Sequence, residues 1–184
     1  MLASENTQSI ELNAAPVSVD ELAWSAVNAA AIDATSVRVD AQRDAVAFVD
    51  TGRLQQAVAN LLANAERYGG DRVLLVARAD AGSLVIEVHD DGSGVPRKYE
   101  FLIWEKFERG PNRLNATIPG SGIGLAVTNA IAVAHGGVTG YRRSEQLGGA
   151  CFWIRLPGRI HSTSPPLGGA ARLRLVAEDD AQTA

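Results

Sequence analysis

The chain has 184 residues, of which 46% are hydrophobic and 21% charged, a composition that excludes a disordered or fibrous protein and leaves room for one domain with short tails. The net charge of -4 argues against a nucleic-acid-binding surface, because phosphate backbones are bound by clustered positive charge. The single cysteine, Cys151, excludes an intramolecular disulfide framework and a multi-cysteine zinc site.

In the first half of the chain, hydrophobic periodicity predicts a helix, two short strands, a long helix and a β-hairpin, at residues 20–32, 37–39, 45–49, 51–68 and 72–90. The long helix has the clearest pattern. Apolar residues recur on one of its faces, Asp50 or Thr51 caps its beginning, and Gly69-Gly70 ends it. Residues 1–16 form an irregular lead-in.

The second half is rich in glycine, since 12 of the 18 glycines lie between Gly92 and Gly158. Residues 92–121 lack periodicity, and we expect a mobile loop with a short helical piece near residues 101–107. Loops of such length inside a domain are usually functional. A helix and two strands are predicted to follow, and then a flexible tail, at residues 123–134, 137–143, 150–156 and 159–184.

Asn60, Asn64 and Arg67 share one stripe of the long helix, beside its apolar face. A carboxamide oxygen is a hard, neutral ligand that suits Mg²⁺, which takes one or two protein oxygens and completes its shell with water and phosphates. Arg67 would then face the phosphates. The alternative interpretation is an exposed polar stripe on a surface helix, which these three residues alone would favour.

Asp90 ends a strand rich in Val and Ile and begins the run Asp90-Asp91-Gly92-Ser93-Gly94. Its carboxylate is placed to accept a hydrogen bond from an exocyclic amine, while Gly92 and Gly94 let a planar base approach the backbone. The alternative is a capped turn, because turns are rich in Asp and Gly.

The run Gly120-Ser121-Gly122-Ile123-Gly124 leads directly into the helix predicted at residues 123–134. Small residues before a helix offer unpaired N–H groups and the positive end of the helix dipole to an anion. The run therefore predicts a phosphate cradle, although it lacks the Gly-Lys-Ser/Thr of a Walker motif. Arg109 and Arg113, in the preceding loop, are candidates to close over the terminal phosphate.

Taken in this order, the segments resemble the ATP-binding catalytic domain of bacterial sensor histidine kinases, in the superfamily shared with DNA gyrase, the large heat-shock chaperone and mismatch-repair ATPases. The asparagine, first glycine, phenylalanine and second glycine boxes of that family correspond to residues 61–68, 90–94, 101–109 and 120–125. The resemblance implies an α+β fold of the Bergerat type, a two-layer sandwich with helices packed on one face of a mixed β-sheet. It also implies a catalytic domain at residues 17–158, with residues 1–16 following a missing dimerisation segment.

The resemblance further implies which residues hold the nucleotide. Asn64 is the expected magnesium ligand, Asn60 lies near the γ-phosphate and Asp90 reads adenine. The implied cofactor-binding residues are Asn64, Tyr68, Asp90, Gly92, Gly94, Phe107, Gly120, Gly122, Gly124 and Leu125, and the implied catalytic residues are Asn60, Arg67, Arg109 and Arg113. Asp91 stands where the family often has Asn, and this departure touches neither the metal nor the adenine position.

The function implied by the resemblance is binding of ATP with Mg²⁺ and transfer of the γ-phosphoryl group to a histidine on a separate dimerisation domain, which passes it to a response regulator. No histidine precedes the expected domain, and none of the three in the chain is a good candidate acceptor. The alternatives are a non-catalytic ATP-sensing module and a serine kinase of the anti-sigma-factor type, which normally lacks the phenylalanine box. A cytoplasmic location without membrane contact by the chain itself is expected.

Overall fold

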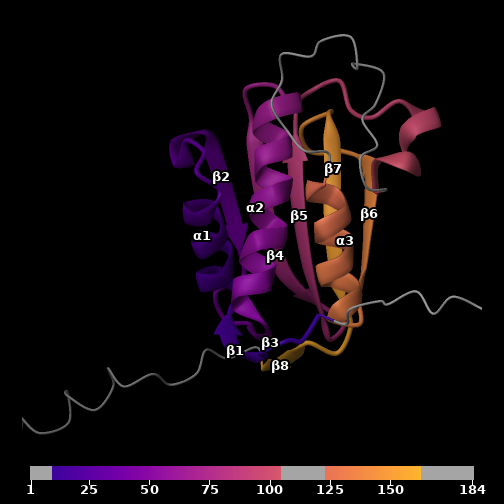
Figure 1. Ribbon diagram of the computed structural model, residues 1–184. Coiled ribbons are helices and arrows are strands. Elements are labelled where there is room, and N and C mark those ends of the chain that lie inside the picture. Colours follow the sequence, from indigo (N-terminus) through magenta and orange to yellow (C-terminus); the bar gives the residue numbers. More distant parts are fainter. Residues whose placement is uncertain (1–9, 105–122, 163–184) are drawn as a thin grey trace, which may run out of the picture.

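Two sheets of different size organise the fold, which the computed structural model describes for residues 10–104 and 123–162. The main sheet has five strands in the order β2-β4-β5-β7-β6, with the bounds Val37–Ala41, Val73–Asp80, Ser83–Asp90, Ala150–Leu156 and Val138–Arg143. The smaller sheet has three strands in the order β1-β3-β8, with the bounds Ala15–Ser18, Val46–Val49 and Ile160–Ser162. It lies across the lower end of the main sheet in Figure 1.

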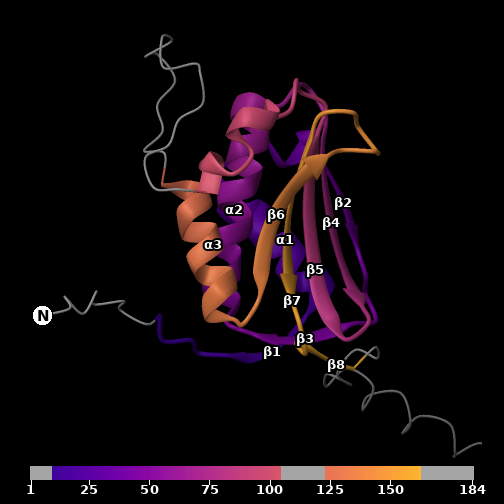
Figure 2. The ribbon, with the colours of Figure 1, turned by 90° about the vertical axis from the view of Figure 1, so that its right-hand side faces the viewer.

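Three helices cover one face of the main sheet, α1 (Val19–Ala29), α2 (Thr51–Tyr68) and α3 (Gly124–Ala134), as Figure 1 and Figure 2 show from two sides. The apolar core fills the space between these helices and the inner face of the sheet. Its fully buried side chains include Leu22, Leu54, Leu61, Leu75, Ile86, Ile131 and Ile154. The expected two-layer α+β fold is therefore confirmed. In the described ranges no helix combines the length and the apolar character needed to cross a membrane.

The main sheet is mixed because one of its strands runs parallel to its neighbour. β2 pairs with β4 in parallel, with Val37 opposite Val73, whereas the other three pairs are antiparallel. Parallel neighbours need a long crossover connection. Here the chain between β2 and β4 passes through β3 and α2.

α2 begins and ends where its sequence signals predict. The Asp50 carboxylate caps the helix by accepting a hydrogen bond from the Arg53 N–H at 2.9 Å. Six apolar residues of one face are buried, Leu54, Ala57, Val58, Leu61, Leu62 and Ala65. The helix ends at Gly69, whose N–H donates to the Ala65 carbonyl at 2.8 Å. The polar stripe with Asn60 and Asn64 is consequently held at a fixed angle to the core.

The structure differs from the sequence-based expectation on the C-terminal side of residue 158. A tail was expected from residue 159, but Ile160–Ser162 form β8, which pairs with β3. The Phe48 N–H also donates to the Arg159 carbonyl at 2.8 Å. A three-residue strand carries too little periodic signal to be recognised, and only its partner reveals it. Short 3₁₀ helices occur at Arg97–Tyr99 and Leu102–Trp104, and the rest of the expected helical piece lies outside the described residues.

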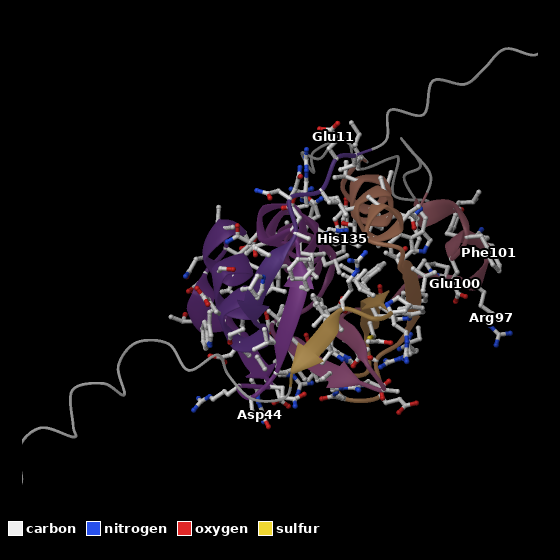
Figure 3. All side chains as sticks on the ribbon, turned by 90° about the horizontal axis from the view of Figure 1, so that it is seen from below. Glu11, Asp44, Arg97, Glu100, Phe101 and His135 are labelled. Atoms are coloured by element: carbon white, nitrogen blue, oxygen red, sulfur yellow. The ribbon has the colours of Figure 1, made fainter. Side chains whose placement is uncertain are left out.

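His135, just after α3, joins three parts of the fold in the interior of the molecule (Figure 3). Its imidazole is neutral by geometry, because Nδ1–H donates to the Ile131 carbonyl at 2.8 Å while Nε2 accepts from the Asp50 N–H at 3.1 Å. The Arg159 guanidinium donates twice to the His135 carbonyl, at 2.7 and 3.1 Å. α3, the cap of α2 and the chain leading into β8 therefore meet at one residue.

We expect the free energy of unfolding to fall between pH 7.5 and pH 5.5. Burial, as the main cause, lowers the pKa of His135 below its usual value, and it lowers the pKa of buried His89 as well. Because the folded state keeps these histidines neutral, only the unfolded state takes up protons as the pH falls through the unfolded-state pKa of about 6.5. The free energy of unfolding therefore decreases below that pH. Urea unfolding at the two pH values measures this difference. The difference should shrink in His135→Gln, and an equal difference in that variant would contradict the assignment.

Candidate nucleotide-binding site

Asp90 is the last residue of β5, and its side chain is only 4% exposed. Its Oδ1 atom accepts two backbone hydrogen bonds, from the Gly92 N–H at 3.0 Å and from the Ala150 N–H at 2.9 Å. The other carboxylate oxygen makes no hydrogen bond within the described part of the chain. The carboxylate is thus fixed through one oxygen, which leaves the second free to accept from a ligand.

Three glycines let the backbone approach Asp90 closely. A Cβ atom on Gly69 would lie 2.7 Å from the Asp90 Cβ, and one on Gly149 would lie 2.4 Å from Asp90 Oδ1. A Cβ atom on Gly92 would lie 2.8 Å from the Gly69 Cα. These separations are too short for any side chain. Gly92 was expected at this site from the sequence, whereas the roles of Gly69 and Gly149 were missed. The pairs Gly69-Gly70 and Gly148-Gly149 were the available signal.

The adjacent acid, Asp91, has a different role. Its carboxylate accepts from the Arg72 side chain at 2.8 Å and from the Arg72 N–H at 3.0 Å. These hydrogen bonds hold the pKa of Asp91 below its usual value. Asp91 therefore ties the end of β5 to the segment that precedes β4. Of the two neighbouring carboxylates, Asp90 is the one with an oxygen left for a ligand.

On α2, the expected polar stripe is present beside the start of α3. The Asn60 Nδ2 group donates to the Gly124 carbonyl at 3.1 Å, which directs its carboxamide, and Oδ1 accepts no hydrogen bond from a described residue. Asn64, one turn further along α2, is half-buried and makes no hydrogen bond to a described residue. Arg67 is exposed at the end of this stripe. The two carboxamides thus lie together, with oxygen atoms available.

The first turn of α3 packs against Asn60. The Gly124 carbonyl accepts from Asn60 and also from the Thr128 hydroxyl, at 3.0 Å. Ile123 provides no side-chain cap, so the first N–H groups of α3 have no partner from a capping side chain. Leu125 packs partly against the core. The structure accordingly places Gly124 next to Asn60.

Four of the expected site residues, Asn60, Asn64, Arg67 and Tyr68, lie along the second half of α2, which ends beside Asp90. Asn60 is nine residues before Gly69, which touches Asp90, and nine residues rise by roughly 13 Å in an α-helix. Tyr68, at the end of α2, is 56% exposed. Gly94 has φ +74° and lies against β6. Five further expected residues lie outside the described ranges, Phe107, Arg109, Arg113, Gly120 and Gly122.

Other reactive side chains are buried away from this stripe. His89 and His135 are 0% and 1% exposed. Cys151 is fully buried, and burial raises the pKa of its thiol to about 12. In the parts of the chain that the structure describes, no three His, Cys, Asp or Glu side chains are grouped to hold a metal ion.

The described chain is thus an α+β sandwich with a half-engaged carboxylate at a strand end and two asparagines on the neighbouring helix. Residues 49–160 match the family model of the histidine kinase-, DNA gyrase B- and HSP90-like ATPases. This match covers well over half of the chain. The chain therefore belongs to this family.

Similar proteins are sensor kinases. KdpD of Escherichia coli strain K12, a sensor protein, is 39% identical over 122 residues, which are 65% of this chain and 13% of KdpD. The histidine-protein kinase AfsQ2 of Streptomyces coelicolor is 37% identical over 153 residues, 80% of this chain and 25% of AfsQ2. The solved ATP-binding domain of PrrB from Mycobacterium tuberculosis aligns with a TM-score of 0.60 and 28% identity, covering 84% of this chain and 99% of that one. The chain spans a quarter or less of these two curated relatives.

Proposed function

We propose that this chain is the ATP-binding catalytic part of a cytoplasmic sensor kinase, which binds ATP with Mg²⁺ and donates the γ-phosphoryl group to a histidine on a separate segment. The observation that carries the proposal is that Asp90, at the end of β5, lies beside the end of α2, the helix that carries Asn60 and Asn64. Asp90 offers one carboxylate oxygen as an acceptor for the amino group of a base, and Gly69, Gly92 and Gly149 let the backbone pack closely around its other oxygen. Asn60 and Asn64 lie on α2 about one to two turns before the end that contacts Asp90. The phosphates of a nucleotide whose base is bound at Asp90 would extend toward them.

The donor set fits a magnesium ion carried by the nucleotide. Asn60 Oδ1 and the Asn64 carboxamide are neutral oxygen ligands, and Mg²⁺ accepts one or two of these when phosphates and water complete its octahedron. Bound Mg²⁺ would neutralise charge on the phosphates. The chain's own contribution is to orient the nucleotide.

The phosphoryl acceptor is proposed to lie on another segment, because His89 and His135 are fully buried. Phosphoryl transfer depends mostly on positioning and on charge neutralisation. The third histidine, His161, lies in β8, which begins beside Gly82 at the opposite end of β5 from Asp90. We therefore expect the acceptor histidine to come from another segment. A dimerisation domain that carries such a histidine, and through it a response regulator, are the proposed partners.

The test adds a separate histidine-bearing dimerisation hairpin to the purified chain with labelled ATP and Mg²⁺. We expect ATP binding by calorimetry, acid-labile phosphate on the hairpin, and no label on the chain itself. Acid-stable phosphate on serine would favour a serine kinase instead. Binding without transfer would favour an ATP-sensing module, and acid-labile phosphate on the isolated chain would contradict the separate acceptor.

A further inference from the structure

Two side chains of β6 hold the backbone that follows Asp90. The Tyr141 hydroxyl accepts from the Val95 N–H at 2.9 Å and lies 3.4 Å from the Val95 carbonyl, to which it donates. The Arg143 guanidinium donates to the Ser93 carbonyl at 3.0 Å. Segment 93–95 is therefore fixed at both of its ends by a strand that lies 46 or more residues away in the sequence.

Gly94, between these two contacts, is shaped to the same side chains. Its φ of +74° lies in the left-handed region that favours glycine. A Cβ atom at this position would lie 3.0 Å from the Tyr141 hydroxyl and 3.1 Å from Arg143 Nη1. The backbone of segment 93–95 thus adopts a conformation that depends on the absence of a side chain and on the presence of Tyr141 and Arg143.

Tyr141 is itself held by aromatic packing. Its ring lies 5.4 Å from the Phe152 ring, and Phe152 in turn packs edge-on against Trp104 at 6.0 Å. Such ring pairs restrict the orientation of each member. The hydroxyl is therefore presented to Val95 from a fixed position, and its removal leaves the ring packing in place.

Segment 93–95 directly continues the backbone that fixes Asp90. The Gly92 N–H donates to Asp90 Oδ1, and Ser93 follows immediately. A shift of Ser93 would move Gly92 and with it the orientation of the Asp90 carboxylate. On the β7 side of the β6–β7 hairpin, the Gly149 N–H donates to the Asp90 backbone carbonyl at 3.1 Å and the Ala150 N–H donates to Asp90 Oδ1 at 2.9 Å. The β6–β7 hairpin thus supports the base-binding residues from two directions.

We propose that Tyr141 and Arg143 are positioning residues for nucleotide binding, which hold segment 93–95 and thereby orient Asp90 and Gly92 toward the base. The inference rests on the proposed function, since it assigns a role in binding the nucleotide that Asp90 receives. Neither residue belongs to the four boxes of the family resemblance. Their contribution is through the backbone, and no contact with the nucleotide is required of them.

The test compares Tyr141→Phe with the unaltered chain and with Tyr99→Phe as the matched control. The same hydroxyl is removed in the control, where it makes no hydrogen bond to a described residue. We expect Tyr141→Phe to raise the Kd for ATP about threefold to tenfold, the loss typical of one hydrogen bond. Hydrogen exchange at the Val95 amide should speed up without nucleotide, while the urea midpoint stays close to that of Tyr99→Phe. Arg143→Gln should weaken ATP binding in the same direction.

Each outcome distinguishes one role from another. Faster exchange at Val95 with an unchanged Kd would overturn the positioning role, because the contact would then serve stability alone. An unchanged exchange rate would overturn the contact itself. If the unaltered chain bound no ATP, the proposed function would fail and the nucleotide role of Tyr141 with it. If the unaltered chain and Tyr141→Phe bound ATP equally, the inference would fail and the proposed function would stand.

Discussion

Replacing Asn64 by alanine is expected to abolish Mg²⁺-dependent ATP binding and to leave the fold intact. The side chain is half-buried on the polar stripe of α2, takes no part in the buried apolar face and makes no hydrogen bond to a described residue. Removing a residue that only hydrogen-bonds to a metal ligand lowers metal affinity about tenfold to a hundredfold. Removing a direct ligand should lower it at least as much. Calorimetric titration with ATP, with and without Mg²⁺, measures the effect.

Gln56→Ala is the matched control for this substitution. Gln56 is a carboxamide on the same helix, two turns before Asn64, and it is exposed. Removing it should change neither ATP affinity nor the circular dichroism spectrum. If Asn64→Ala bound ATP with Mg²⁺ as tightly as Gln56→Ala, the magnesium assignment would be wrong.

Replacing Asp90 by asparagine should weaken ATP binding about tenfold to a hundredfold, the range for a hydrogen bond to a charged group. The Gly92 and Ala150 N–H groups both point at Oδ1, so the amide oxygen of the new side chain must take that place. The amide nitrogen then occupies the open position of Oδ2. An amino group of the base would meet a second donor where it now meets an acceptor.

Asp91→Asn provides the comparison for this change. Asp91 is the neighbouring carboxylate, but its hydrogen bonds go to Arg72. The Asp91→Asn substitution should leave ATP affinity nearly unchanged. It should cost at most a little stability, because the ion pair that it removes includes an exposed arginine. Binding of a guanine nucleotide separates the two effects in Asp90→Asn. A proportional loss for both bases would indicate a folding defect and would contradict the role of Asp90 in reading adenine.

The parts of the fold that could be predicted are those whose signals are local. α2 carries its cap, its apolar stripe and its terminal glycines within one segment, and the β4–β5 hairpin has two apolar runs joined by a tight turn. The partners of β2 and β3 could not be predicted in this way. These strands are neighbours in the sequence but belong to different sheets, because β2 pairs with β4 and β3 with β1 and β8.

The residues of the candidate site likewise fall into those that a local motif predicts and those that only the folded sheet reveals. Asn60, Asn64 and Asp90 stand in short motifs whose residue types suggest their chemistry. Ala150 and Tyr141 bond to Asp90 and Val95 across 60 and 46 residues respectively. No local pattern connects residues at such separations, since the register of β6, β7 and β5 brings them together. Only the assembled sheet shows that the β6–β7 hairpin supports the site.

The smaller sheet brings the first and last described strands close together, which makes the chain suitable for circular permutation. β1 and β8 flank β3 on its two sides, with Ala15 opposite Val49 and Ser162 opposite Val46. The start of β1 and the end of β8 therefore lie roughly 14 Å apart, because two interstrand spacings combine with a three-residue offset along the strand. A linker of a few residues would close that gap. The turn at Arg43 and Asp44 is exposed, and Asp44 lies at the periphery in Figure 3. A circular permutant opened there would separate two strands that share no ladder and would keep every contact around Asp90.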